Sequence, residues 1–106
     1  MTSWLPPEAD EWGGRPVART IGGAGPRQRI AVTANVVSMT LRGQPCRVLD
    51  ARVDDGTGRL ILRWLGRAAV AGVSCDARLR IEGTVLSSRG ELVVLNPLYE
   101  VRPPGA

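Results

Sequence analysis

The segment Asp54-Asp55-Gly56-Thr57-Gly58 is the sequence feature that most constrains how this chain folds. It lies between two apolar runs at residues 48–53 and 60–65. Glycine readily takes the positive φ that tight turns need and aspartate tolerates it, so such a segment between strand-like runs predicts a β-hairpin. One face of that hairpin would pack on a core, and the residues on its other face would decide what the protein contacts.

Alternation of apolar and polar residues continues on both sides of the hairpin. It predicts strands at residues 29–41, 46–54, 60–65, 76–87 and 91–101. In the hairpin, the inward side chains are expected to be Leu49, Ala51, Val53, Leu60, Leu62 and Trp64. Residues 66–73 predict a short helical connector between the third and fourth strands. An all-β chain in this order is typical of a five-stranded Greek-key barrel of the OB-fold type.

The composition changes once along the chain. Residues 1–28 hold four prolines and five glycines without periodicity, so we expect a flexible or loosely docked N-terminal arm. Trp4 and Trp12 lie in this arm, where an aromatic residue either anchors a partner or folds back on the domain. The barrel is expected at residues 29–102, followed by a frayed C-terminus at residues 103–106.

The charge favours nucleic acid as a partner. The 106-residue chain has a net charge of +4, and its fourteen basic residues are all arginine, whose planar fork pairs with phosphate. With no histidine, a Cys–His or Ser–His nucleophile cannot be assembled, which excludes a conventional hydrolase. We expect a binding module with no enzyme activity, no catalytic residue and no cofactor. Cys46 and Cys75 lack the spacing of a metal site and are expected to be small buried apolar residues.

No apolar run reaches the roughly 20 residues that span a membrane, so no membrane partner is expected. Residues 1–7 lack the charged-then-apolar order of a signal peptide. We therefore expect a cytoplasmic protein.

Several motifs resemble one family. The segments VTANVVS at 32–38, DDGTG at 54–58, WL at 64–65, IEG at 81–83 and NPLYE at 96–100 resemble the OB-fold wedge domain of the RecG branch-migration helicase. The similarity covers roughly residues 15–101 and implies a module that contacts branched or single-stranded DNA. The chain lacks a phosphate-binding Gly-x-x-x-x-Gly-Lys-Ser/Thr loop, so ATP-driven unwinding is not implied. Ala34 replaces a usual glycine and Ser74-Cys75-Asp76 a usual Pro-Gly, which favours a free-standing relative.

OB modules bind ligands across the outer face of strands two and three, between the loop joining strands one and two and the loop joining strands four and five. Mapping this face onto the chain gives the candidate nucleic-acid-binding residues Arg42, Arg47, Arg52, Arg59, Ile61, Arg63 and Arg89. Arg52 and Arg63 could instead pair with Asp50 and Asp54. Trp64 shares the phase of the core residues, so a core role is favoured over base stacking.

Two functions remain open. The first is a sequence-tolerant nucleic-acid-binding module for single-stranded or branched DNA, or for RNA, because composition carries no signature of the 2′-hydroxyl. The alternative is a protein-interaction module that docks a partner or associates with itself. It would use Ile61 and Leu65, or the arm with Trp4 and Trp12.

Overall fold

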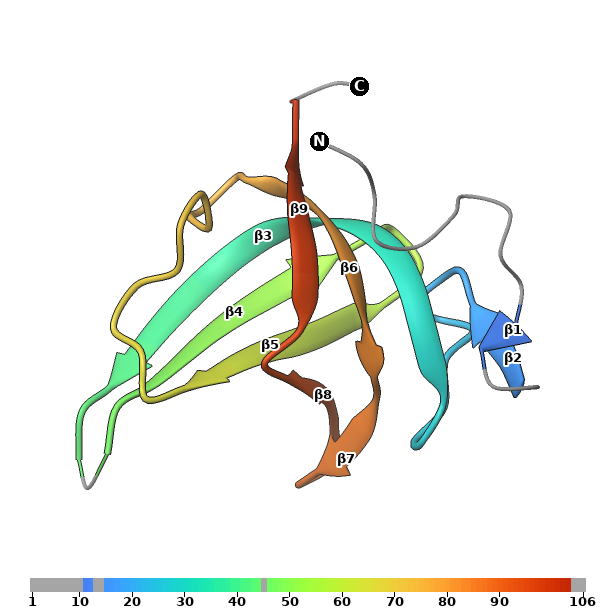
Figure 1. Ribbon diagram of the computed structural model, residues 1–106, viewed down its shortest axis with the longest axis horizontal. Coiled ribbons are helices and arrows are strands. Elements are labelled where there is room, and N and C mark those ends of the chain that lie inside the picture. The colour runs from blue at the N-terminus through green and yellow to red at the C-terminus, as the bar shows by residue number, and fades with distance from the viewer. Residues whose placement is uncertain (1–10, 13–14, 45, 104–106) are drawn as a thin grey trace.

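The computed structural model describes residues 11–12, 15–44 and 46–103. In these residues the chain forms strands joined by turns and no helix, so the expected all-β class is confirmed (Figure 1). The strands are β1 (Glu11–Trp12), β2 (Arg15–Ala18), β3 (Arg29–Arg42), β4 (Val48–Asp54), β5 (Arg59–Leu65), β6 (Arg78–Thr84), β7 (Leu86–Ser88), β8 (Glu91–Leu95) and β9 (Leu98–Arg102). The described part of the chain thus offers no helix that could cross a membrane.

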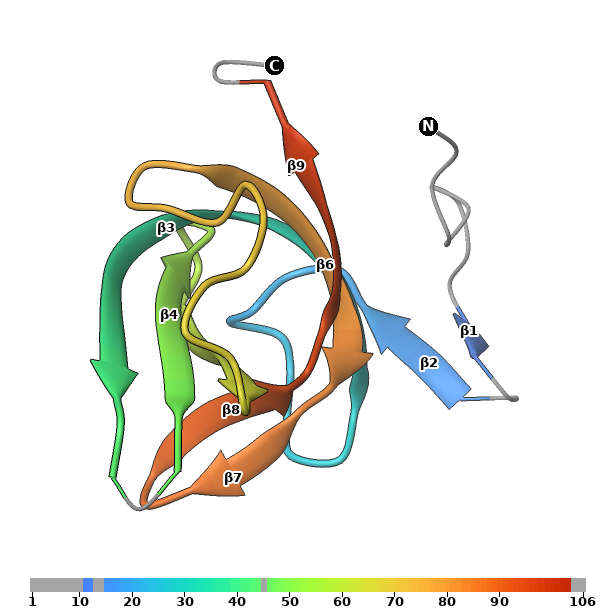
Figure 2. The ribbon, with the colours of Figure 1, turned by 60° about the vertical axis from the view of Figure 1, so that its left-hand side comes forward.

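The strands from β3 onward form one sheet that curls around a single core (Figure 2). Hydrogen bonds join them in the order β7-β8-β5-β4-β3-β6-β9, and within this path only the pair β5–β8 is parallel. The chain runs directly from β8 into β9, so it links the two sides of the curled sheet covalently. The expected barrel is therefore a rolled sheet and not a continuously hydrogen-bonded cylinder.

The expected count of five strands is wrong, because two of the five are split and two short strands precede them. The fourth divides into β6 and β7 at Val85, whose backbone pairs with the loop before β3: Val85 N–H donates to Gln28 O (2.9 Å), and Val85 O accepts from Arg27 N–H (2.6 Å). The fifth divides into β8 and β9 at Asn96, which has a φ of 45°, and Pro97, which has no N–H to donate. The other three predicted strands correspond to β3, β4 and β5, and their ends agree with the observed ends within two residues.

The expected helical connector is also wrong. Residues 66–77 form turns, with Gly66 and Gly72 at φ values of 78° and 75°. So short a segment cannot offset the cost of helix nucleation, and positive φ at both glycines ends any helical turn. Val70 and Val73 are nevertheless buried in the core, so the connector closes one end of the rolled sheet. Tyr99 holds it there by donating its hydroxyl to Ala71 O at 2.7 Å.

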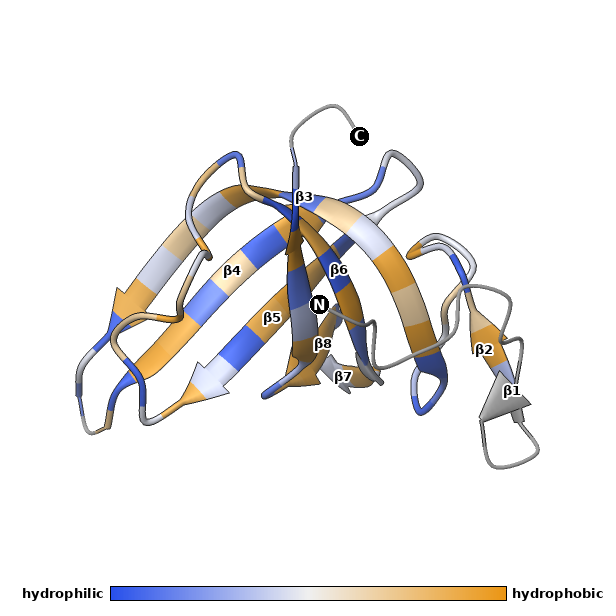
Figure 3. Cartoon of the chain, turned by 45° about the horizontal axis from the view of Figure 1, so that its top comes forward, coloured by the Kyte–Doolittle hydropathy of each residue, from blue (hydrophilic) through white to orange (hydrophobic). Residues whose placement is uncertain are grey.

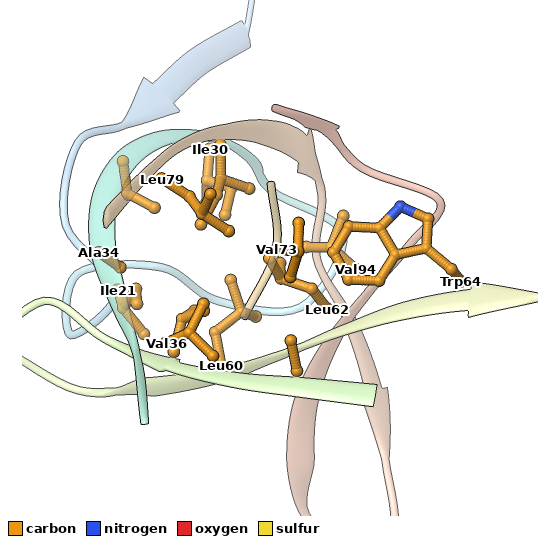
Figure 4. Packing of buried hydrophobic residues seen from close by; sticks show 14 of the residues in the cluster. Ile21, Ile30, Ala34, Val36, Leu60, Leu62, Trp64, Val73, Leu79 and Val94 are labelled. Carbon is orange, nitrogen blue, oxygen red and sulfur yellow. The ribbon is translucent and has the colours of Figure 1, made fainter. Parts of the chain in front are cut away.

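The alternation predicted for the hairpin is confirmed. All six residues predicted to face inward keep 4% or less of their surface exposed, and they pack in one cluster. Figure 3 shows the alternation as bands of hydrophobic and hydrophilic colour along the strands, and Figure 4 shows Leu60, Leu62 and Trp64 in the cluster. Trp64 lies edge-to-face against Tyr99, with ring centroids 5.9 Å apart and planes at 80°. Trp64 is therefore a core residue and offers no stacking surface.

The described part of the expected arm packs against the sheet. β2 pairs in parallel with the start of β3, and Ile21, only 2% exposed, joins the core (Figure 4). Ile21 N–H donates to Asp55 Oδ2 and Gly22 N–H to Thr57 Oγ1, both at 2.8 Å. A Cβ on Gly22 would lie 2.5 Å from Thr57 O, so only glycine fits this approach. The hairpin turn is thus the docking site for residues 21–22.

Other expectations about the arm are not tested. Trp4 and the side chain of Trp12 lie outside the described residues. The domain boundary expected at residue 28 also stays a prediction.

Both cysteines differ from the sequence expectation. Cys46 and Cys75 are exposed free thiols in the segments just before β4 and β6, where the sheet alternation no longer turns side chains inward. Within the described ranges, no group of three or more potential ligands is arranged to hold a metal ion.

Candidate nucleic-acid interface

The outer face of β4 and β5 carries polar residues in cross-strand rows. Arg52 on β4 lies opposite Ile61 on β5, and Asp50 lies opposite Arg63. Alternate residues of a strand point to the same face, so the inward phase of Ala51 and Leu62 forces these four outward. The hairpin register therefore brings two arginines to adjacent positions on one surface.

The end of β3 and the turn between β7 and β8 border this surface and form a groove of about 440 Å³ with it. The groove is lined by Thr40, Arg42, Asp50, Arg52, Ile61, Arg63, Ser88, Arg89 and Glu91. Arg42 comes from the end of β3, and Arg89 from the turn between β7 and β8, where it has a φ of 51°. Five of the seven predicted residues are thus brought together.

The other two predicted residues lie outside the groove lining. Arg47 is exposed in the loop before β4, where its backbone oxygen accepts from Gly66 N–H at 2.8 Å. Arg59 follows the hairpin turn, and its Nε donates to Asp54 Oδ2 at 3.1 Å. Neither side chain lines the surface that the five others share.

The groove arginines alternate with carboxylates. Arg63 donates from Nε and Nη2 to the two oxygens of Asp50, at 2.8 and 3.0 Å. Arg42 Nη2 reaches the same carboxylate at 3.4 Å. Arg52 Nη1 donates to Glu91 Oε2 at 2.6 Å. The alternative pairing considered from the sequence is therefore right for Arg63 but not for Arg52.

The contact between Arg52 and Glu91 stabilises the charged forms of both partners. The hydrogen bond from Arg52 lowers the pKa of the Glu91 carboxyl, and the bond to Glu91 raises the pKa of Arg52. The hydrogen bond to Asp50 likewise raises the pKa of Arg63. Four arginines and two carboxylates line the groove, so its net charge is +2.

Arg89 differs from the other groove arginines, because it is exposed and makes no ion pair with any described residue. It precedes Gly90, which has a φ of 80°, and the two residues form the tight turn between β7 and β8. This guanidinium is the one in the groove that a ligand meets without first displacing a carboxylate.

Ile61 lies on the outward face as predicted but keeps only 4% of its surface exposed. Ile61 thus lies at the base of the groove, next to its register neighbour Val93 on β8, which is also buried. Alternation gives the direction of Ile61 but cannot show what covers it.

Sequence reasoning missed Glu91, Thr40 and Ser88 as groove residues. The signal for Glu91 was its outward phase with Val93 and Leu95. Its approach to Arg52, 39 positions earlier in the chain, depends on the parallel pairing of β5 with β8, which local patterning does not show.

The fold resembles that of solved structures. Over 80% of this chain it matches the HINb domain of p204 with a TM-score of 0.63 at 15% identity. Over 78% it matches a chain of a replication protein A heterotrimer bound to ssDNA, with a TM-score of 0.57 at 17% identity. The chain has an OB-type fold. It spans 47% and 63% of those two chains. No family model and no curated protein matches the sequence.

In OB-fold terms, β3, β4 and β5 are strands one to three, β6–β7 is strand four and β8–β9 is strand five. The groove therefore lies on strands two and three, between the end of strand one and the turn that follows strand four. OB folds bind oligonucleotides and oligosaccharides at this place.

Proposed function

We propose that this chain is a nucleic-acid-binding OB module for single-stranded or branched DNA, with low sequence specificity and no chemistry of its own. The observation that carries the proposal is the groove, in which four arginines surround the OB ligand position with a net charge of +2. The likeness to a chain of a replication protein A heterotrimer bound to ssDNA supports a single-stranded ligand. The resemblance to the RecG wedge favours a branched one.

The ion pairs suggest how the groove would take a backbone. A phosphate offers a guanidinium the same kind of charged oxygens as a carboxylate, so it can replace Asp50 at Arg63 or Glu91 at Arg52. The Arg52–Glu91 pair is nearly half exposed, and an exposed pair is worth only about 0–1 kcal/mol, so exchange there is cheap. The bidentate Arg63–Asp50 pair is largely buried, so its exchange costs more. Phosphate contacts fix position and carry no sequence information, which is the basis for the low specificity.

The test is a titration of labelled single-stranded, duplex and forked DNA, and of single-stranded RNA, across a range of salt concentrations. Binding is expected to weaken as salt rises, because phosphate neutralisation releases counterions. Affinity that ignores salt, or that survives Arg52→Ala combined with Arg63→Ala, would contradict the proposal.

A matched pair of variants separates the groove from general charge. Arg89→Gln removes a groove arginine, and Arg67→Gln removes an exposed arginine of the connector that does not line the groove. Neither arginine makes an ion pair with a described residue. Arg89→Gln is expected to lower the affinity and to reduce the salt slope by about 0.7, the value of one single-strand phosphate contact. Arg67→Gln should leave both unchanged.

A protein-interaction module is the second candidate, because Leu65 is half exposed on the outer face. Ile61, its predicted companion, is buried, which weakens this candidate. Sedimentation of the protein would address self-association, and a pull-down with residues 1–28 present or deleted would address the arm. A strictly monomeric protein without partners would argue against this function.

A further inference from the structure

A second apolar group lies outside the core, next to the arginines of the groove. Three residues form one row across the outer face: Ile61 on β5 lies opposite Val93 on β8, which lies opposite Leu86 on β7. Leu95 lies two residues after Val93 on the same face of β8, and its register neighbour on β5 is Arg63. Ile61 and Val93 are buried, but Leu86 and Leu95 keep 40% and 42% of their surface exposed. The outer face is therefore charged on β4 and at Glu91, and apolar at Val93 and Leu95 of β8 and at Leu86 of β7.

The apolar side is also hollowed. Leu86 and Leu95 line a depression of about 310 Å³ together with Leu98 and the buried Pro97. Gly83 lies in its wall, and the ion pair of Arg29 with Glu82 borders it. Leu95 and Arg63 are on neighbouring strands, about 4.8 Å apart, so the depression begins one strand away from a groove guanidinium.

An occupant must therefore place anionic and apolar parts side by side. A single nucleic-acid strand has this character, because its phosphates run beside bases whose faces are uncovered. The aromatic residues that usually receive such bases are unavailable in the barrel, since Trp64 is buried and its neighbour Tyr99 binds the connector. Leu86 and Leu95 are exposed apolar side chains beside the arginine rows, and Leu95 is the register neighbour of Arg63.

We propose that Leu86 and Leu95 form the base-contacting side of the groove, so that a bound strand lies with its phosphates over β4 and β5 and its bases over β8 and β7. This inference rests on the proposed function and extends it. It implies selection for unpaired bases, because a duplex keeps its base faces stacked and hidden from the leucines.

The test compares two labelled oligonucleotides of equal length, an oligothymidine and an abasic oligomer that keeps every phosphate. The double variant Leu86→Ser and Leu95→Ser is expected to bind the oligothymidine roughly fivefold more weakly, the low end of a base-stacking contribution. It should bind the abasic oligomer as the unmodified protein does. Arg89→Gln should weaken binding to both.

Leu41→Ser is the matched control, because Leu41 is 53% exposed and faces the opposite side of the sheet from Arg42. It should change neither affinity. Circular dichroism checks folding, and Leu86→Ser alone replaces the double variant if that does not fold.

Each other result overturns the inference. If the protein binds both oligomers and the leucine variant changes neither affinity, or changes both equally, the base-contacting side is wrong while the proposed function stands. If the unmodified protein binds no oligonucleotide, both fail. If the variant converts a dimer into a monomer and leaves DNA binding unchanged, the apolar side faces a second copy of this chain.

Discussion

At the residue scale, three of the four groove arginines are held by carboxylates that also compete with a ligand. Glu91 holds Arg52 from the first position of β8, across the groove. Both side chains of this pair are nearly half exposed, so solvent screens their attraction. The Glu91 carboxylate thus positions the Arg52 guanidinium, and breaking this ion pair when a ligand binds costs little free energy.

Glu91→Gln is expected to strengthen binding of single-stranded DNA two- to fivefold, because Arg52 no longer exchanges a carboxylate for a phosphate and an exposed pair is worth about 0–1 kcal/mol. Fluorescence anisotropy at fixed low salt measures the change. Asp76→Asn is the control: it removes an equally exposed acid outside the groove, and asparagine tolerates the φ of 71° at that position. Equal gains in both variants would show that only net charge matters.

Local register made part of the groove predictable. Asp50 and Arg63 are cross-strand neighbours in one hairpin, so their pairing follows from the position of the turn. Glu91 reaches Arg52 only through the pairing of β5 with β8, and the burial of Ile61 depends on the same contact. Non-local pairing of this kind leaves no trace in short-range alternation.

At the scale of elements, the hairpin turn carries a second role beyond joining β4 to β5. The Asp55 carboxylate accepts hydrogen bonds from Ile21 N–H, from Thr57 N–H and hydroxyl, and from Gly58 N–H. Burial works to raise the pKa of Asp55, but these bonds outweigh it and lower the pKa below the ordinary value of 3.8. One side chain therefore both shapes the turn and holds residues 21–22 against it.

Asp55→Ala is expected to lower the free energy of unfolding by about 1–3 kcal/mol at pH 7, because backbone donors lose a charged acceptor. A folded-state pKa below 3.8 means that this contribution is present above that pH and is lost as pH falls through the folded value. Urea unfolding of both proteins should thus show a gap at pH 7 that narrows below about pH 3.8. A gap that widens in acid would contradict this role.

Gly83 lets β6 approach β8 where the two sides of the sheet meet. A Cβ there would lie 2.3 Å from Val94 Cγ1, and that branched side chain is fully buried. Gly83→Ala is expected to cost about 1–3 kcal/mol in the free energy of unfolding, as overpacking does. Adding Val94→Ala should recover part of the loss, measured by urea denaturation. Gly43→Ala, which meets open space, is the control, and a lack of rescue would assign the loss to the backbone.

The strand interiors were predictable and their interruptions were not. Alternation placed Leu49 through Trp64 correctly, because one face of the hairpin is buried along its whole length. The break at Val85 arises because its backbone pairs with residues 27 and 28, far away in the sequence. The connector at residues 66–77 buries Val70 and Val73 without forming a helix, because closing the core requires only that their side chains point inward.

At the scale of the whole molecule, the core extends beyond the predicted barrel. Ile21 contributes to the same cluster as the strands, although it comes from a segment with no alternation of its own. Proline and glycine in that segment indicated flexibility. The docking of Ile21 depends instead on how closely the chain at Gly22 approaches the hairpin turn.

Ile21→Ala therefore tests whether the docked segment unfolds together with the sheet. We expect it to lower the free energy of unfolding by about 2–5 kcal/mol, as loss of a buried isoleucine does, and to do so for the sheet as a whole. Hydrogen exchange of the backbone amides in β4 and β5 measures the stability of the sheet at positions remote from the substitution. Leu41→Ala deletes a similar aliphatic side chain that is 53% exposed, so it should change stability by no more than about 0.5 kcal/mol. Unchanged exchange in β4 and β5 of Ile21→Ala would mean that residues 15–28 undock independently, and the fold would then begin at β3.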